Sequence, residues 1–159
     1  MSDFETLVVT TDFSESSRRA FAPAMAIARK FSSTVVVVHV VEDRLPAFVD
    51  EFAAIPVEEI LDSQARRAAQ ELQQFVKPYE GSGVPLERVV LRGTPHLEIA
   101  RLAAERKAAL VAMSTHGRGF ISHALFGSTT ERVVRRAPCP VLTVRGPEPK
   151  ERGGDAGPA

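Results

Sequence analysis

The sequence predicts an α/β fold, in which an open parallel sheet of five strands is doubly wound and carries helices on both faces. Five short apolar runs alternate with four segments of helical periodicity, and this alternation is typical of a parallel sheet. The run Thr34–Val41 is almost continuously apolar, which indicates a strand buried on both faces. Five strands are too few for a closed eight-stranded barrel, so we expect an open sheet.

The N-terminal part of the chain contains two predicted strands around one helix. Thr6–Thr10 is short, apolar and rich in β-branched residues, as expected of a buried strand. The segment Asp12–Ser14 interrupts this run, and Ser14 is a suitable N-cap for a helix. One face of that helix should carry Phe21, Met25, Ala28 and Phe31. The second strand is Thr34–Val41.

A second helix follows an irregular segment, residues 42–56, which contains Pro46 and Pro56. This helix should end near Lys77-Pro78, and Gly81-Ser82-Gly83 predicts a turn. Apolar residues spaced 4, 3, 4 and 3 apart mark its buried face: Leu61, Ala65, Ala68, Leu72 and Phe75.

Three further strands and two helices complete the predicted order. Thr94 and Pro95 suit the N-cap and the first position of a helix. The other elements are strands at Leu86–Leu91, Ala109–Met113 and Val141–Val144 and a helix at Ser128–Arg136. We therefore expect one domain over residues 1–145, and a disordered tail rich in Pro, Gly and charge over residues 146–159.

Composition excludes several classes of function. The 20 basic and 20 acidic residues balance, so no overall charge favours nucleic acid or an anionic membrane as a partner. No apolar run approaches the roughly 20 residues that span a bilayer, and the acidic start lacks a signal-peptide pattern. A single cysteine, Cys139, rules out an intrachain disulfide and suits a reducing compartment. We expect a soluble, cytoplasmic protein.

The most informative motif lies where the fourth strand meets the last helix. Ser114-Thr115-His116-Gly117 follows the strand, and nine residues separate Gly117 from Gly127-Ser128-Thr129. Glycine lets a backbone approach a ligand closely, and a helix N-terminus presents unpaired N–H groups to phosphate. The alternative for Ser128 is a capping box with Glu131, and both roles can coexist.

Topology predicts the same location for a ligand. Ligands of open α/β sheets bind beyond the carboxyl ends of the strands, where the strand order reverses. For an assumed Rossmann-like order 3-2-1-4-5, the reversal lies between the first and fourth strands. The loops at that point are Thr10-Thr11-Asp12 and residues 113–127.

Other nucleotide and catalytic motifs are missing from the sequence. It has no Gly-x-x-x-x-Gly-Lys-Ser/Thr loop, no Gly-x-Gly-x-x-Gly after the first strand and no Gly-x-Ser-x-Gly elbow. The four histidines are too scattered to form a metal site. Cys139, between two prolines, suits a partly buried position better than a reactive thiol.

Together these segments resemble the universal stress protein family over about residues 4–145. The matching pieces are Thr11-Asp12-Phe13-Ser14, Val38-His39-Val40-Val41, Met113 to Arg118, Gly127-Ser128 and Arg136 to Val141. The resemblance is to the ATP-binding branch, whose signature is Gly, two residues, Gly, nine residues, Gly, then Ser or Thr. Here Ser114 replaces the first glycine, and Thr10 stands where relatives often have proline.

The resemblance implies a role for each matching residue. Asp12 lies near adenine and ribose, although it can also simply cap the following helix. Val40 and Met113 lie against the base, and Arg118 either pairs with phosphate or is solvated. Val41 would share the adenine edge with Val40. The implied nucleotide-binding set is Thr10, Asp12, Val40, Met113, Ser114, Gly117, Arg118, Gly127, Ser128 and Thr129.

The resulting hypothesis is a nucleotide-responsive regulatory module of the stress response that binds ATP, with Mg²⁺ bridging the phosphates. No catalytic residue is assigned, since no general base can be placed beside the γ-phosphate. The alternatives are a slow ATPase on the same site and an interaction protein that binds no nucleotide, which Ser114 favours. The resemblance also implies a homodimer through Val141–Val144, a short apolar strand expected at the sheet edge.

Overall fold

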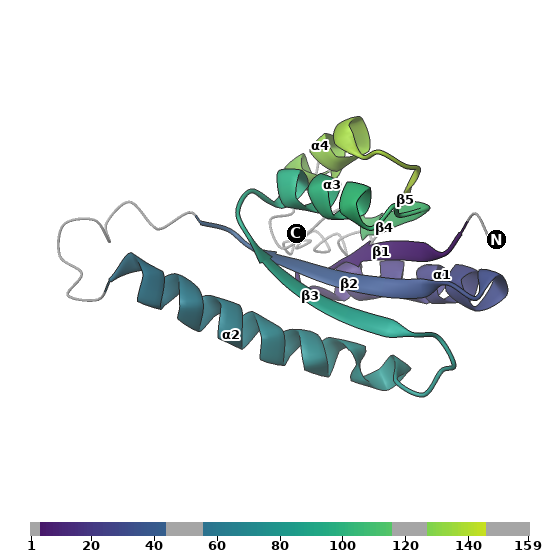
Figure 1. Ribbon diagram of the computed structural model, residues 1–159, viewed down its shortest axis with the longest axis horizontal. Coiled ribbons are helices and arrows are strands. Elements are labelled where there is room, and N and C mark those ends of the chain that lie inside the picture. The colour runs from purple at the N-terminus through teal and green to yellow at the C-terminus, as the bar shows by residue number, and fades with distance from the viewer. Residues whose placement is uncertain (1–3, 44–55, 116–126, 146–159) are drawn as a thin grey trace, which may run out of the picture.

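A five-stranded parallel sheet forms the centre of the molecule (Figure 1). The computed structural model describes residues 4–43, 56–115 and 127–145. The strand order is β3-β2-β1-β4-β5, which confirms the predicted fold class and strand order. The strands are β1 (Thr6–Thr10), β2 (Thr34–Val41), β3 (Leu86–Arg92), β4 (Leu110–Ser114) and β5 (Val141–Val144).

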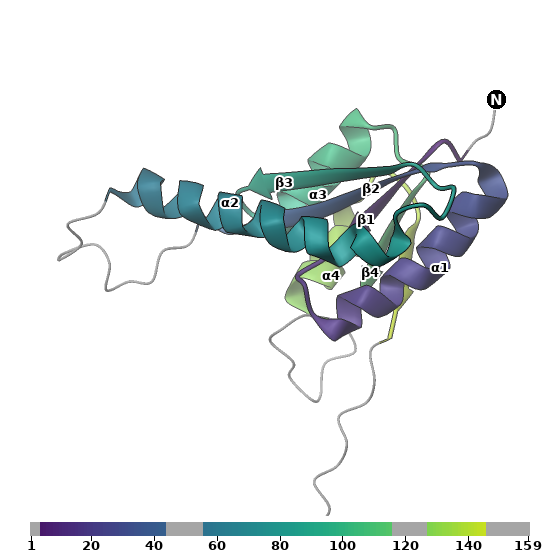
Figure 2. The same ribbon diagram turned by 90° about the horizontal axis from the view of Figure 1, so that it is seen from below.

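Four helices cover the two faces of the sheet, with α1 and α2 on one side and α3 and α4 on the other (Figures 1 and 2). Their bounds are α1 (Glu15–Phe31), α2 (Val57–Val76), α3 (Pro95–Glu105) and α4 (Ser128–Arg136), and a short 3₁₀ helix, η1 (Lys77–Tyr79), extends α2. The doubly wound arrangement is therefore as the sequence predicts.

Alternation along the central strands divides the core into two layers. In β2, Val35 and Val37 join the cluster under α1 and α2, whereas Val36 and Val38 join the cluster under α3 and α4. All four side chains are fully or almost fully buried. Successive strand residues point to opposite faces, so a strand covered on both faces must be apolar at every position.

Helix starts agree with the sequence in two cases. Ser14 is the N-cap of α1, and its hydroxyl accepts a hydrogen bond from the backbone N–H of Ser17. Thr94 and Pro95 occupy the N-cap and first position of α3, although the Thr94 side chain makes no capping bond.

Two local expectations are wrong. Gly127, not Ser128, is the N-cap of α4, so Ser128 is already helical and makes no capping box with Glu131. Phe31 is 39% exposed rather than in the core, because it ends α1 at the margin of the sheet and stacks on Phe4 there.

Some predicted features lie outside the described ranges. These are the predicted tail, most of the irregular segment over residues 42–56, and the positions Gly117 and Arg118. Among the helices of the described ranges, none combines the length and hydropathy that a membrane span requires.

Candidate functional site

A cleft of about 370 Å³ opens at the carboxyl ends of β1, β2 and β4. It lies at the reversal of strand order, because β1 pairs with β2 on one side and β4 on the other. Eight of the ten predicted ligand residues line it: Thr10, Asp12, Val40, Met113, Ser114, Gly127, Ser128 and Thr129. Gly117 and Arg118 lie outside the described residues.

The apolar wall of the cleft comes from the sheet face that carries α3 and α4. Val38, Ile99 and Met113 are nearly fully buried there, and the partly buried Val40 packs against the same cluster. Because side chains of β2 alternate between faces, Val38 and Val40 reach the cleft together. This wall is apolar, as the surface that binds a purine base would be.

Thr11 organises the polar side of the cleft through its buried side chain. Its Oγ1 accepts a hydrogen bond from the backbone N–H of Phe13 at 2.9 Å and lies 2.9 Å from the hydroxyl of Ser17 on α1. Its own N–H donates to the carbonyl of Val38 at 2.9 Å. This one residue therefore ties the end of β1 to both β2 and α1.

Asp12 and Phe13 follow this junction and line different hollows of the molecule. The Asp12 carboxylate lines the cleft and accepts a hydrogen bond from the Ser14 N–H at 3.0 Å, so it also supports the start of α1. Phe13 has a φ of 65°, a left-handed conformation that costs energy for a bulky residue. Its ring stacks on His39 at 4.3 Å, and His39 Nδ1 lies 2.8 Å from the carbonyl oxygen of Thr11.

The opposite wall is formed where β4 meets α4. The buried hydroxyl of Thr130 donates to the carbonyl of Ser114 at 2.9 Å, and the Gly127 N–H donates to the carbonyl of Thr115 at 2.7 Å. These bonds fix the N-terminus of α4 against the end of β4, where Ser128 and Thr129 line the cleft. An anion in the cleft would meet the positive end of the helix dipole there.

Ser114 has an extended backbone within β4 and is not among the residues with positive φ. The backbone at this position therefore does not require glycine. The departure from the family signature leaves the local geometry ordinary.

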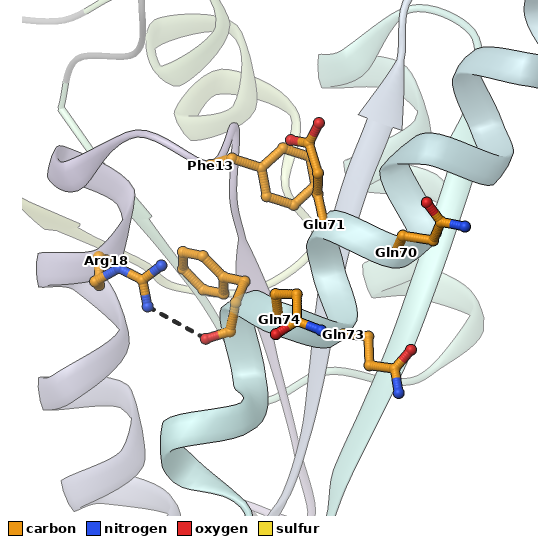
Figure 3. Close-up of a pocket in the computed structure, with 7 residues that line it drawn as sticks. Phe13, Arg18, Gln70, Glu71, Gln73 and Gln74 are labelled. Carbon is orange, nitrogen blue, oxygen red and sulfur yellow. Dashed lines mark hydrogen bonds between the residues drawn. The ribbon is translucent and has the colours of Figure 1, made fainter.

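A second hollow, of about 530 Å³, lies on the other face between α1 and α2 (Figure 3). The Arg18 guanidinium lies 4.4 Å from the centroid of the Phe75 ring, and its Nη1 donates to the Phe75 carbonyl at 3.3 Å. Three glutamines and Glu71 of α2 line the rest of it. It is larger than the cleft, and Phe13, just after β1, also lines it, but its cation is already engaged with Phe75.

The Cys139 thiol and the possible metal ligands of the described residues show no arrangement suited to chemistry. Burial raises the pKa of the Cys139 thiol, which opposes the thiolate form needed for reactivity. Within the described ranges, no three His, Cys, Asp or Glu side chains gather as a metal site would require.

Several residues that line the cleft were not predicted to contact a ligand, although Thr11 and His39 belong to segments that carry the family resemblance. Thr11, Ser17, Pro95 and Thr130 line the cleft or brace its walls, and His39 supports the β1–α1 junction. For Thr11 a signal existed, since it lies beside Asp12 at a strand end. Thr130 and Pro95 come from the other helices, so only the packing of α3 and α4 brings them to the site.

The fold and this cleft define an open α/β domain with a cleft at its topological switch point. The family model for the universal stress protein family matches residues 3–145. The chain therefore belongs to the universal stress protein family. Universal stress protein MJ0531 of Methanocaldococcus jannaschii is 34% identical over 149 residues, covering 91% of this chain and 84% of that protein. A universal stress protein of Thermus aquaticus is also 34% identical, over 144 residues, covering 89% and 99% of the two chains.

Solved structures show the same fold. MJ0577, a structure determined for assignment of biochemical function, has a TM-score of 0.81 and 26% identity and covers 92% of this chain and 99% of its own. A universal stress protein in complex with cAMP has a TM-score of 0.67 and 24% identity, with 89% and 97% coverage. The protein from Archaeoglobus fulgidus in complex with dAMP has a TM-score of 0.60 and 23% identity, with 90% and 98% coverage. At these last two identities, the likeness to this chain is one of fold.

Proposed function

We propose that this protein binds ATP in the cleft at the ends of β1, β2 and β4 and acts as a nucleotide-responsive regulatory module of the stress response. One observation carries the proposal: residues from four separate segments that the sequence marks as nucleotide contacts converge on this one cleft. Two universal stress proteins of the same fold were solved with adenine nucleotides, cAMP and dAMP, which supports an adenine ligand.

The chemistry of the walls suits the parts of such a ligand. The base would lie on the apolar wall of Val38, Val40 and Met113, with Asp12 toward the ribose. The phosphates would lie at the N-terminus of α4, near Ser128 and Thr129. Mg²⁺ would bridge phosphate oxygens, and the Glu42 carboxylate at the cleft offers the oxygen chemistry that this ion prefers.

Occupancy of the cleft would alter the surface around the N-terminus of α4, which is how a partner would sense the nucleotide. We also propose a homodimer through β5, which lies at the edge of the sheet. A cytoplasmic location agrees with the single cysteine.

A thermal shift measurement with and without MgATP tests the proposal. At about 100 times the dissociation constant, binding adds roughly 2.7 kcal/mol, which raises Tm by about 5–10 °C for a domain of this size. Gly127→Val should abolish the shift, because it adds a branched side chain to the lining of the cleft. The variant should still fold, since the φ of −66° at Gly127 accommodates a side chain. Ala104→Val, on the exposed side of α3, is the matched control and should keep it.

Nucleotide retained from expression would mask the shift. The purified protein should therefore be denatured and its supernatant checked for adenine absorbance. Absence of both a shift at millimolar MgATP and retained adenine would refute ATP binding and favour the interaction protein that binds no nucleotide. Phosphate release that is lost in Gly127→Val would instead support the slow ATPase.

A further inference from the structure

A smaller hollow of about 270 Å³ continues the cleft beyond the start of α4. The two share four lining residues: Glu42, Pro95, Ser128 and Thr129. The hollow also reaches Gly93, Thr94 and His96 at the start of α3, and Arg132 on α4. A ligand with its first phosphate at Ser128 can therefore extend its further phosphates into this hollow, because the two spaces adjoin.

Arg132 is the cationic side chain of this hollow. It lies four residues after Ser128, so the two residues share one face of α4 and are separated by one helical turn. Within the described residues, no carboxylate lies at ion-pair distance from Arg132, whereas Arg135 on the same helix pairs with Glu131 at 2.9 Å. Its guanidinium is thus available to an anion.

The other charges around the hollow define which anion fits. Asp43 also lines it, and its carboxylate lies 3.9 Å from Arg92. Glu42 makes no ion pair with a residue of the described ranges and would repel a bare phosphate ion. A polyphosphate that carries its own divalent cation would present positive charge to Glu42 and negative oxygens to Arg132.

Resting on the proposed function, we propose that Arg132 contacts the terminal phosphate groups of a nucleoside triphosphate and so distinguishes ATP from AMP. Its planar guanidinium provides paired donors for phosphate oxygens, which a lysine cannot reproduce. The adenosine part of the ligand and its first phosphate would be bound without Arg132. The residue therefore sets specificity for the number of phosphates rather than affinity for adenine.

Isothermal titration calorimetry with ATP and AMP in the presence of Mg²⁺ tests this role. Arg132→Gln should weaken ATP binding roughly tenfold, as expected for loss of a charged hydrogen bond, and leave AMP binding within about twofold. Arg135→Gln removes the same charge from the same helix but does not line the hollow, and it should change neither affinity. The wild-type protein should bind ATP more tightly than AMP.

Equal losses for ATP and AMP in Arg132→Gln, or no loss for either, would overturn the role of Arg132 while leaving nucleotide binding intact. A loss of the same size in Arg135→Gln would also overturn it, since the effect would then come from net charge. Failure of the wild-type protein to bind any adenine nucleotide would overturn the proposed function and this inference together.

Discussion

Replacement of Thr11 by valine removes one hydroxyl from the junction between β1 and α1. That hydroxyl accepts the Phe13 N–H and lies 2.9 Å from the Ser17 hydroxyl. Ser17 would keep its second bond, to the Ser14 carbonyl at 2.8 Å, but the Phe13 N–H would lose its acceptor. The strained conformation of Phe13 would then lose the hydrogen bond that holds it.

The expected loss of stability in Thr11→Val follows from the hydrogen bonds that the variant loses and keeps. The Phe13 N–H is partly buried, and an unsatisfied buried donor costs about 1–3 kcal/mol; valine nearly matches threonine in shape, so no large cavity adds to it. We expect the free energy of unfolding to fall by about 2 kcal/mol. For a domain of this size the Tm should fall by about 4–8 °C.

Urea denaturation followed by circular dichroism measures the change. Thr34→Val is the matched control, because Thr34 is a half-buried strand residue whose side chain makes no hydrogen bond. It should leave stability nearly unchanged. A loss below about 0.5 kcal/mol in Thr11→Val, or an equal loss in Thr34→Val, would refute the assignment of Thr11 as the organiser of this junction.

Three further predictions concern other parts of the molecule. Lysine at both Val141 and Val144 should give monomers in sedimentation, because it charges the edge strand; an unchanged dimer would contradict the proposed interface. Burial lowers the pKa of His96, and the charges of Arg132 and Arg136 lower it further. As the pH falls through about 6.5, His96 therefore takes up a proton more readily in the unfolded chain than in the folded protein, and stability decreases. Removal of the Arg132 charge by Arg132→Gln should raise the pKa of His96 in an NMR titration and reduce this loss of stability at low pH. An unchanged pKa would contradict the proximity of Arg132 to His96. Leu72→Ala should lower the free energy of unfolding by about 2–5 kcal/mol in urea, since the side chain is fully buried, and a loss under 1 kcal/mol would contradict its place in the core.

The sequence determined the order and type of the elements because each depends on local pattern. The almost continuous apolar run of β2 is rich in β-branched residues and indicates a strand buried on both faces, and Ser14 could be identified as an N-cap from its position before a periodic segment. The candidate site was also predictable to a large extent, because Asp12 follows β1 and Ser114 ends β4, and the carboxyl ends of these strands meet at one edge of a parallel sheet.

Tertiary structure alone decided how the walls of the cleft are built. Thr130 reaches the Ser114 carbonyl, and Pro95 reaches the cleft, only because α4 and α3 pack on one face of the sheet. The exposure of Phe31 at the end of α1 likewise depends on neighbouring segments. The physical reason is that periodicity along a chain specifies which residues are buried within an element, whereas contacts between elements depend on how those elements dock.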